Sequence, residues 1–157
     1  MSFAEELERQ REHVMRLVRL ASVSWADAMR AHKLAPPDAG FAGRLASLSE
    51  AAATEQVAWE QAHQAGLLWR PVPGAESAEP PYELRPGTGR RGPDDLWQRF
   101  DAAVAKLNLA IAGSSAAEVA SAFGDMSQAA GDVSEAIARE DEVTREALAR
   151  TRSRGAA

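Results

Sequence analysis

Hydrophobic residues recur every three or four positions along four stretches of the chain, with polar residues between them. This spacing puts the hydrophobic side chains on one face of an α-helix. It predicts helices over residues 2–35, 37–68, 93–113 and 115–152. The predicted core positions are Phe3, Leu7, Val14, Leu17, Val18, Ala21, Trp25, Ala28, Met29 and His32 in the first helix; Phe41, Leu45, Leu48, Ala52, Gln56, Trp59, His63 and Gly66 in the second; Leu96, Trp97, Phe100, Val104, Leu107 and Ile111 in the third; and Val119, Phe123, Met126, Ala130, Val133, Ile137, Val143 and Ala147 in the fourth.

The predicted helix ends carry recognisable start and stop signals. Ser2–Glu5 and Ser115–Glu118 have the spacing of a capping box, in which the serine hydroxyl accepts a hydrogen bond from the amide three residues on. Proline followed by aspartate at Pro37–Asp38 and Pro93–Asp94 suits a first helical turn. Gly113 is predicted to end the third helix in a left-handed conformation.

Six of the eight prolines lie between residues 71 and 93, so no regular element is expected to cross this stretch. The chain is therefore predicted to be one all-α domain over residues 1–157, a four-helix bundle of two antiparallel helical hairpins joined by a long proline-rich connector. Hairpin 1 covers residues 2–68, the connector 69–92 and hairpin 2 93–152, with a frayed tail at 153–157. The first, second and fourth helices are much longer than the third, so we expect either an ordered connector beside the short helix or a fourth helix that projects. The connector has apolar anchors at Trp69, Val72, Tyr82 and Leu84, so we favour the ordered connector.

Composition supports the all-helical prediction and narrows the function. Alanine supplies 34 residues, whereas the β-branched and aromatic residues typical of sheets are sparse. Arginine outnumbers lysine sixteen to two, which is typical of GC-rich coding sequence, and the net charge of −5 argues against direct nucleic-acid binding. There is no cysteine, no signal-like start and no apolar run long enough for a membrane. We therefore expect a cytoplasmic protein with no membrane partner.

The second predicted helix contains a Glu-x-x-His spacing, Glu60 to His63, which places a carboxylate and an imidazole on one face. Di-iron bundles use two such motifs, and this chain has one. A single-metal site of His13, Glu60 and His63 is a weaker hypothesis, because the two histidines fall at similar heights in the hairpin. More often such histidines flank a core, and no metal or other cofactor is expected.

A ridge of small residues follows the fourth predicted helix beside its hydrophobic stripe. It consists of Ser121, Gly124, Ser127, Gly131 and Ser134. Small side chains permit close helix approach, either within the bundle or between two copies of the chain. Charged residues are also sparse from residue 102 to 131. We take the ridge as the candidate interface.

The connector carries candidate docking residues of two kinds. Trp69 and Tyr82 are apolar anchors, and Arg85, Arg90 and Arg91 could contact a partner. The Arg-Pro-Gly-Thr-Gly run lacks the glycine–lysine–serine pattern of a nucleotide-binding loop, so a solvated turn is the simpler interpretation.

No sequence pattern supports catalysis. The chain has no Gly-x-Ser-x-Gly motif, and its paired acids fall at a helix start or on a charged helix face. We therefore expect a non-enzymatic protein that acts by protein–protein interaction, as an adaptor or scaffold or by self-association as a homodimer. The alternative is a bundle that binds a small molecule or metal at an internal site near Trp59.

Overall fold

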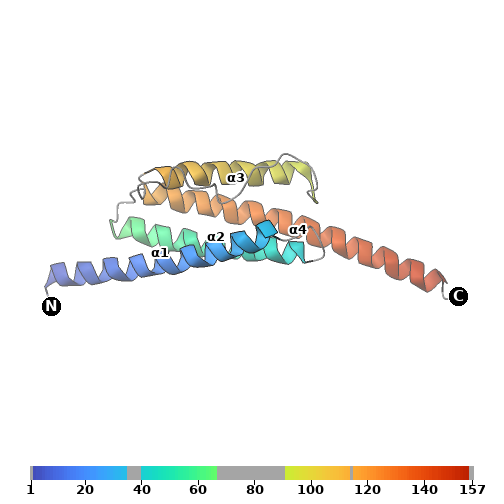
Figure 1. Cartoon of the computed structure of the whole chain (residues 1–157), viewed down its shortest axis with the longest axis horizontal. Helices are drawn as coiled ribbons and strands as arrows, with labels where there is room; N and C mark the ends of the chain where they lie inside the picture. The colour runs from blue at the N-terminus through green and yellow to red at the C-terminus, as the bar shows by residue number, and fades with distance from the viewer. Residues whose placement is uncertain (1, 35–39, 67–90, 114, 156–157) are drawn as a thin grey trace.

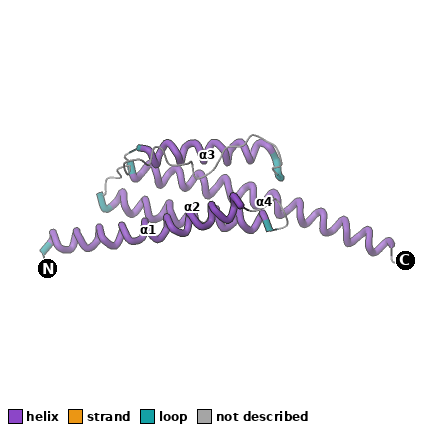
Figure 2. Tube along the Cα trace, in the orientation of Figure 1, coloured by secondary structure: helices purple, strands orange, loops and turns teal. Residues whose placement is uncertain are grey.

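The computed structural model describes residues 2–34, 40–66, 91–113 and 115–155. These residues form four helices: α1 (Phe3–Leu34), α2 (Phe41–Gln64), α3 (Asp94–Ala112) and α4 (Ala116–Gly155). Within these ranges there is no strand (Figure 2). No helix of this part of the chain is long and apolar enough to cross a bilayer. Trp69, Tyr82, Arg85 and Arg90, predicted as docking residues, lie outside the described residues.

The helices form two antiparallel hairpins, α1 with α2 and α3 with α4 (Figure 1). The two hairpins meet chiefly through α2 and α4, so that α2 packs against both α1 and α4, and α3 packs against α4. The predicted four-helix bundle of two hairpins is confirmed. The end of α2 and the start of α3, between which the undescribed connector runs in the sequence, lie at opposite ends of the bundle (Figure 1).

One hydrophobic core extends through all four helices. Its fully buried centre comprises Leu45, Leu48, Phe100, Leu107, Met126 and Ile137. Aromatic rings join α1 to its neighbours: Trp25 packs edge-on against Phe123, with ring centroids 5.2 Å apart. His32, a predicted core position, is buried and stacks on Phe41 at 5.3 Å. Most of the predicted stripe positions are therefore core residues.

Local hydrogen bonds account for where two helices begin. The amide of Glu5 donates to Ser2 Oγ (3.2 Å), and the amide of Glu118 donates to Ser115 Oγ (3.3 Å), as both capping boxes predicted. Pro93 precedes α3 in an extended conformation, with two aspartates in the first turn. The second helix begins later than predicted, at Phe41, and Pro37 and Asp38 lie outside the described residues.

The prediction of a left-handed stop at Gly113 is wrong. Gly113 has a φ of −83°, whereas the left-handed glycines are Gly66 (φ 71°) and Gly92 (φ 105°). A Cβ at Gly113 would lie 3.3 Å from the carbonyl oxygen of Ala110. Glycine ends α3 there because the chain passes close to its own last turn.

The predicted stripes are also wrong at three places. In α2, Glu55 and Ala62 are buried in place of the predicted Gln56 and His63, of which Gln56 is half-buried and His63 is exposed. In α1 Phe3 is 84% exposed, and the first buried residue is Val14. In α4 the last buried residue is Ile137, and Val143 and Ala147 are exposed. The start of α1 and the end of α4 are exposed because no neighbouring helix of the described chain packs beside them.

The extended ends are the most visible feature of the molecule's shape. Residues 3–13 of α1 form the N-terminal projection, and residues 142–155 of α4 form the C-terminal projection. They leave the bundle at opposite ends of its long axis (Figure 1). At 1.5 Å per residue, the C-terminal projection is about 20 Å long. A projecting fourth helix, the alternative that the sequence favoured less, is therefore observed, together with a projection at the start of α1. The ordered connector that the sequence favoured lies outside the described residues.

Candidate functional site

The core contains one buried acid among the described residues, Glu55, whose side chain is 1% exposed. It lies on α2 one turn before Trp59, and the indole Nε1 of Trp59 donates a hydrogen bond of 2.8 Å to Glu55 Oε2. The hydroxyl of Ser22 on α1 also hydrogen-bonds this carboxyl group. The acid therefore joins α1 to α2 at a point where the rest of the contact is hydrophobic.

Burial raises the pKa of Glu55 to about 7, because the charged form loses its hydration. The hydrogen bonds from Trp59 and Ser22 act in the opposite direction and do not offset this effect. A carboxyl with this pKa changes charge near neutral pH. Its two hydrogen-bond partners are an indole and a hydroxyl, so neither is an acid–base group that could share a proton with it at neutral pH.

Most of the predicted small-residue ridge packs against α2. Ser49 and Ser127 exchange hydrogen bonds: Ser49 Oγ donates to the Ser127 carbonyl oxygen (2.7 Å), and Ser127 Oγ donates to the Ser49 carbonyl oxygen (2.9 Å). Ser134 Oγ donates to the carbonyl oxygen of Ala42 at 2.6 Å. We call this contact the α2–α4 seam.

Glycines let the two helices of the seam approach. A Cβ at Gly131 would lie 3.2 Å from Ser49 Oγ, and one at Gly124 would lie 2.6 Å from Gln56 Nε2. Ser121, the remaining ridge residue, is exposed and accepts a 3.2 Å hydrogen bond from Lys106 Nζ. Within one chain, the ridge thus contacts α2 and α3. Its predicted role between copies stays a prediction.

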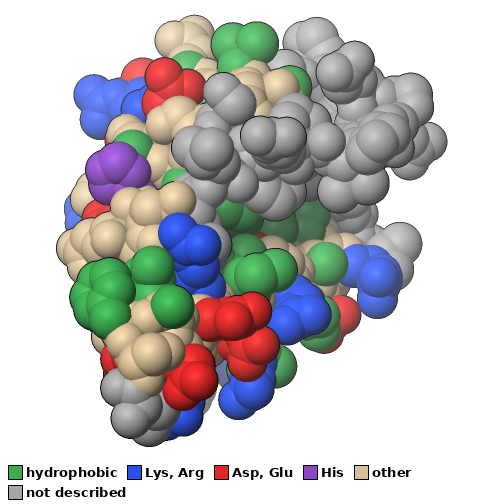
Figure 3. All heavy atoms as spheres, turned by 90° about the vertical axis from the view of Figure 1, so that its left-hand side faces the viewer, with side chains coloured by type: hydrophobic (Ala, Val, Ile, Leu, Met, Phe, Trp, Pro, Cys, Tyr) green, Lys and Arg blue, Asp and Glu red, His purple; other side chains and the backbone are tan. Residues whose placement is uncertain are grey.

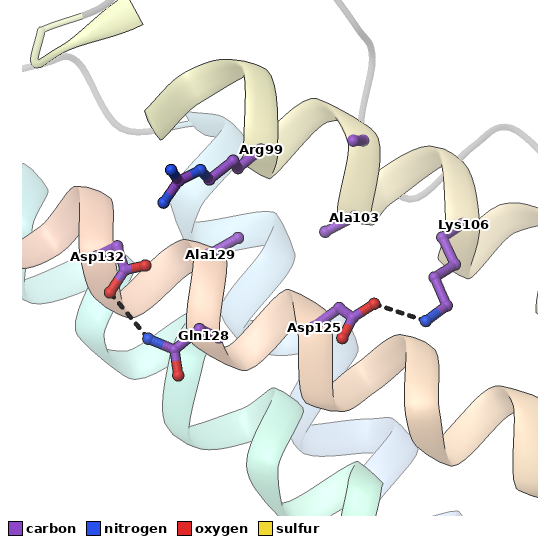
Figure 4. A pocket seen from close by; sticks show the side chains of 8 residues that line it. Arg99, Ala103, Lys106, Asp125, Gln128, Ala129 and Asp132 are labelled. Atoms are coloured by element: carbon purple, nitrogen blue, oxygen red, sulfur yellow. Dashed lines mark hydrogen bonds and ion pairs between the residues drawn. The ribbon is translucent and has the colours of Figure 1, made fainter. Parts of the chain in front are cut away.

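A shallow groove of about 330 Å³ separates α3 from α4 (Figure 4). Lys106 Nζ pairs with Asp125 Oδ2 across it at 2.6 Å, and Arg99 extends from α3 toward the side of α4 that carries Asp132. The Lys106 and Asp125 side chains are each about half exposed, so this pair stabilises the contact by no more than about 1 kcal/mol. The groove is therefore crossed by one exposed ion pair that adds little to the hydrophobic contact of α3 with α4.

A second groove of about 330 Å³ contains two of the three predicted metal ligands. Glu60 and His63 line it with Gln56 and Gln64 of α2 and Ala117, Ala120 and Ser121 of α4. Glu60 Oε1 accepts a hydrogen bond from Gln56 Nε2 (3.4 Å), and His13 lies exposed on α1. Among the described residues, no three histidine or acidic side chains converge as metal ligands. The structure thus brings Glu60 and His63 together without His13.

Arg91 is the first described residue before α3. It pairs with Asp141 of α4, lies 4.0 Å from Glu140, and its carbonyl oxygen accepts a 2.6 Å hydrogen bond from Trp97 Nε1. A predicted docking residue is therefore engaged with α4 of its own chain. This contact fixes the start of α3 at the base of the C-terminal projection.

Exposed apolar side chains lie on both projections. Phe3 is 84% exposed, and Leu148 is 55% exposed. Leu148 falls eleven residues after Ile137, which returns it to the same side of the helix, so it continues the core stripe of α4. Phe3 precedes Leu7 and Val14 at helical spacing and continues the core stripe of α1 in the same way. Both stripes therefore run past the place where their partner helices end.

The end of the molecule from which α1 projects faces the viewer in Figure 3. Exposed hydrophobic side chains lie there beside acidic and basic ones in the lower part of the view, where α1 is located.

Comparison of the chain with protein-family models, with curated proteins and with solved structures finds no match. The function is therefore inferred from the geometry of the chain itself.

Sequence reasoning missed two features of interest, Glu55 and the N-terminal projection. Glu55 occupies a stripe position, seven residues after Leu48 and four before Trp59, with Ala51, Ala52, Ala58 and Ala62 around it. This spacing could have indicated that position 55 is buried. A glutamate is normally expected to face solvent, however, so the hydrophobic pattern did not include it. Prediction of the N-terminal projection would have required knowledge of where α2 ends beside α1.

Proposed function

We propose that this protein acts by protein–protein contact through its two helix projections. The observation that carries the proposal is the exposure of Phe3 and Leu148 on direct continuations of the core stripes of α1 and α4. A helix end extending about three turns beyond a bundle gains little from its own chain, because isolated short helices are marginally stable in water. Contact with another helix would bury these stripes.

The predicted adaptor role and self-association both fit this surface. The projections lie at opposite ends of the molecule, so one chain has two separate places for contact (Figure 1). In contrast, the small residues of α4 already meet α2 over most of the ridge. We therefore propose the two projections, in place of the ridge, as the interface.

Site-specific photocrosslinking in cells tests the proposal. A benzophenone amino acid replaces Phe3 in one variant and Leu148 in another, and Leu109, which is 76% exposed on α3, serves as the control position. We expect crosslinked adducts from the two projection variants and few from the control. Absence of adducts from both projections, in chains that fold normally, would contradict the proposal.

A second candidate function, binding of a small molecule or metal near Trp59, is supported by the groove lined by Glu60 and His63. Both residues lie within about one turn of Trp59 on α2, so a bound cation should change the tryptophan fluorescence. Titration with zinc or nickel, read by calorimetry, tests it with His63→Ala as the control. Equal heats from the two chains, or none above buffer, would remove this candidate.

A further inference from the structure

We infer that the partner of each projection is a second copy of this chain, joined head to tail, so that the C-terminal projection of one copy packs along the N-terminal projection of the next. This inference rests on the proposed function and names the partner. Three observations support it: opposite charge on the two projections, their positions at opposite ends, and the exposed apolar stripe on each.

The two projections carry opposite net charge. Residues 3–13 contain four glutamates and two arginines, whereas residues 142–155 contain four arginines and two glutamates. Glu5, Glu8 and Glu12 follow one another at spacings of three and four, and form one acidic row along α1. On α4, Arg145 and Arg152 stand three residues before and four after Leu148, so they flank its exposed side chain.

Helix dipoles account for only part of this pattern. Acids in the first turn and bases in the last turn stabilise their own helix, and this explains Glu5, Arg152 and Arg154. The dipole effect falls off within one turn of the end. Glu8, Glu12 and Arg145 lie farther from the ends, so the helix dipole does not account for their charge.

The arrangement of the helices fits a head-to-tail contact. α1 and α4 run in the same direction along the bundle, and their projections leave opposite ends (Figure 1). A second copy shifted along the long axis therefore places the start of its α1 beside the end of the first copy's α4. Such a contact joins two different surfaces, so each copy keeps one free projection and the assembly extends or closes into a ring.

The contact is expected to be weak. About three turns of paired helix bury less than the roughly 1,200 Å² at which stable protein interfaces begin. Association should therefore depend on concentration, and added salt should weaken it because the charges are exposed. These properties distinguish it from a fixed homodimer that uses one surface twice.

Charge reversal with complementation tests the inference on the purified full chain. One variant carries Glu8→Lys and Glu12→Lys, and another carries Arg145→Glu and Arg152→Glu. In each variant both projections have the same sign, so we expect self-association to weaken about tenfold or more, measured by sedimentation velocity at low salt. An equimolar mixture pairs opposite signs at every contact and should restore association. Glu50→Lys with Glu135→Lys, exposed positions outside the projections, is the matched control and should associate like the wild type.

Two outcomes would overturn the inference: a wild-type chain that stays monomeric at high micromolar concentration and low salt, or a mixture of the two variants that fails to regain association. Circular dichroism of each variant identifies loss of fold. If the purified chain is monomeric while the Phe3 or Leu148 photocrosslinker captures a different protein in cells, the proposed function stands and the second copy is the wrong partner. If neither projection forms an adduct of any kind, the proposed function itself fails.

Discussion

At the residue scale, Glu55 is the acid whose environment differs most from water in the described part of the chain. Its carboxyl is buried, accepts a hydrogen bond from Trp59, and has a pKa raised to about 7 by loss of hydration. The folded chain therefore binds a proton more tightly at this position than the unfolded chain does. Because the pKa rises on folding, stability is greatest while Glu55 is protonated in both states and declines as the pH rises.

We predict that the free energy of unfolding falls between about pH 4.5 and pH 7 by up to about 3 kcal/mol through this group, and changes little through it at higher pH. Glu55→Gln keeps the hydrogen-bond acceptor and removes the titration, so it should flatten this slope and stabilise the chain above pH 7. Urea denaturation from pH 5 to pH 9 measures both effects. Glu60→Gln, another acid on the same helix, is the control. The same slope in Glu55→Gln and the wild type would contradict the prediction.

The sequence is informative about local residues and less so about Glu55. It predicts Ser2 and Ser115 as caps because a cap depends only on residues three positions apart, and both hydrogen bonds form. The burial of Glu55 depends on Ser22 and the packing of α1, some thirty residues away. Charge alone assigns glutamate to solvent, so the predicted stripe takes the neighbouring Gln56 in its place.

At the element scale, the α2–α4 seam shows what small residues accomplish in this chain. The exchanged hydrogen bonds of Ser49 and Ser127 require the two backbones to be close, and Gly131 provides the space beside them. Spacing alone predicts the ridge, since small residues at helical intervals indicate close approach. Its partner cannot be read from the sequence, because another helix of the bundle and a second copy satisfy the same pattern.

We predict that Gly131→Leu destabilises the fold by about 1–3 kcal/mol, because the new side chain must displace Ser49 and its hydrogen bonds. Gly43→Leu is the matched control on α2: a Cβ there would meet no neighbouring side chain or helix within 4 Å, so this variant should gain up to about 1 kcal/mol from helix propensity. Thermal unfolding of both variants at one concentration makes the comparison. Equal stability of the two would show that the seam does not constrain position 131.

At the scale of the whole molecule, the order of the helices determines which surfaces are free. Proline and glycine positions mark most helix ends, so the sequence predicts that the four helices differ in length. It does not decide between a projecting fourth helix and an ordered connector beside the short third helix, and the connector's apolar residues favour the second. The packing of α2 against both α1 and α4 is not predictable in this way, because a hydrophobic stripe does not specify which other helix it packs against. That packing covers the ridge and leaves Phe3 and Leu148 exposed. The surfaces available to a partner thus follow from helix order as well as from local pattern.

The free ends can be distinguished from the core by two substitutions on one stripe of α4. Ile137→Ala removes a fully buried side chain and should cost about 2–5 kcal/mol of stability. Leu148→Ala, eleven residues later on the same side of the helix, should change stability by less than about 0.5 kcal/mol at low protein concentration, because Leu148 is 55% exposed in the single chain. Urea denaturation at nanomolar concentration measures both.

At high micromolar concentration, Leu148→Ala should weaken self-association while Ile137→Ala leaves the contact surface intact in the chains that remain folded. A large loss of stability from Leu148→Ala in dilute solution would show that the C-terminal projection is packed within its own chain, and the projection would then have no surface to offer a partner.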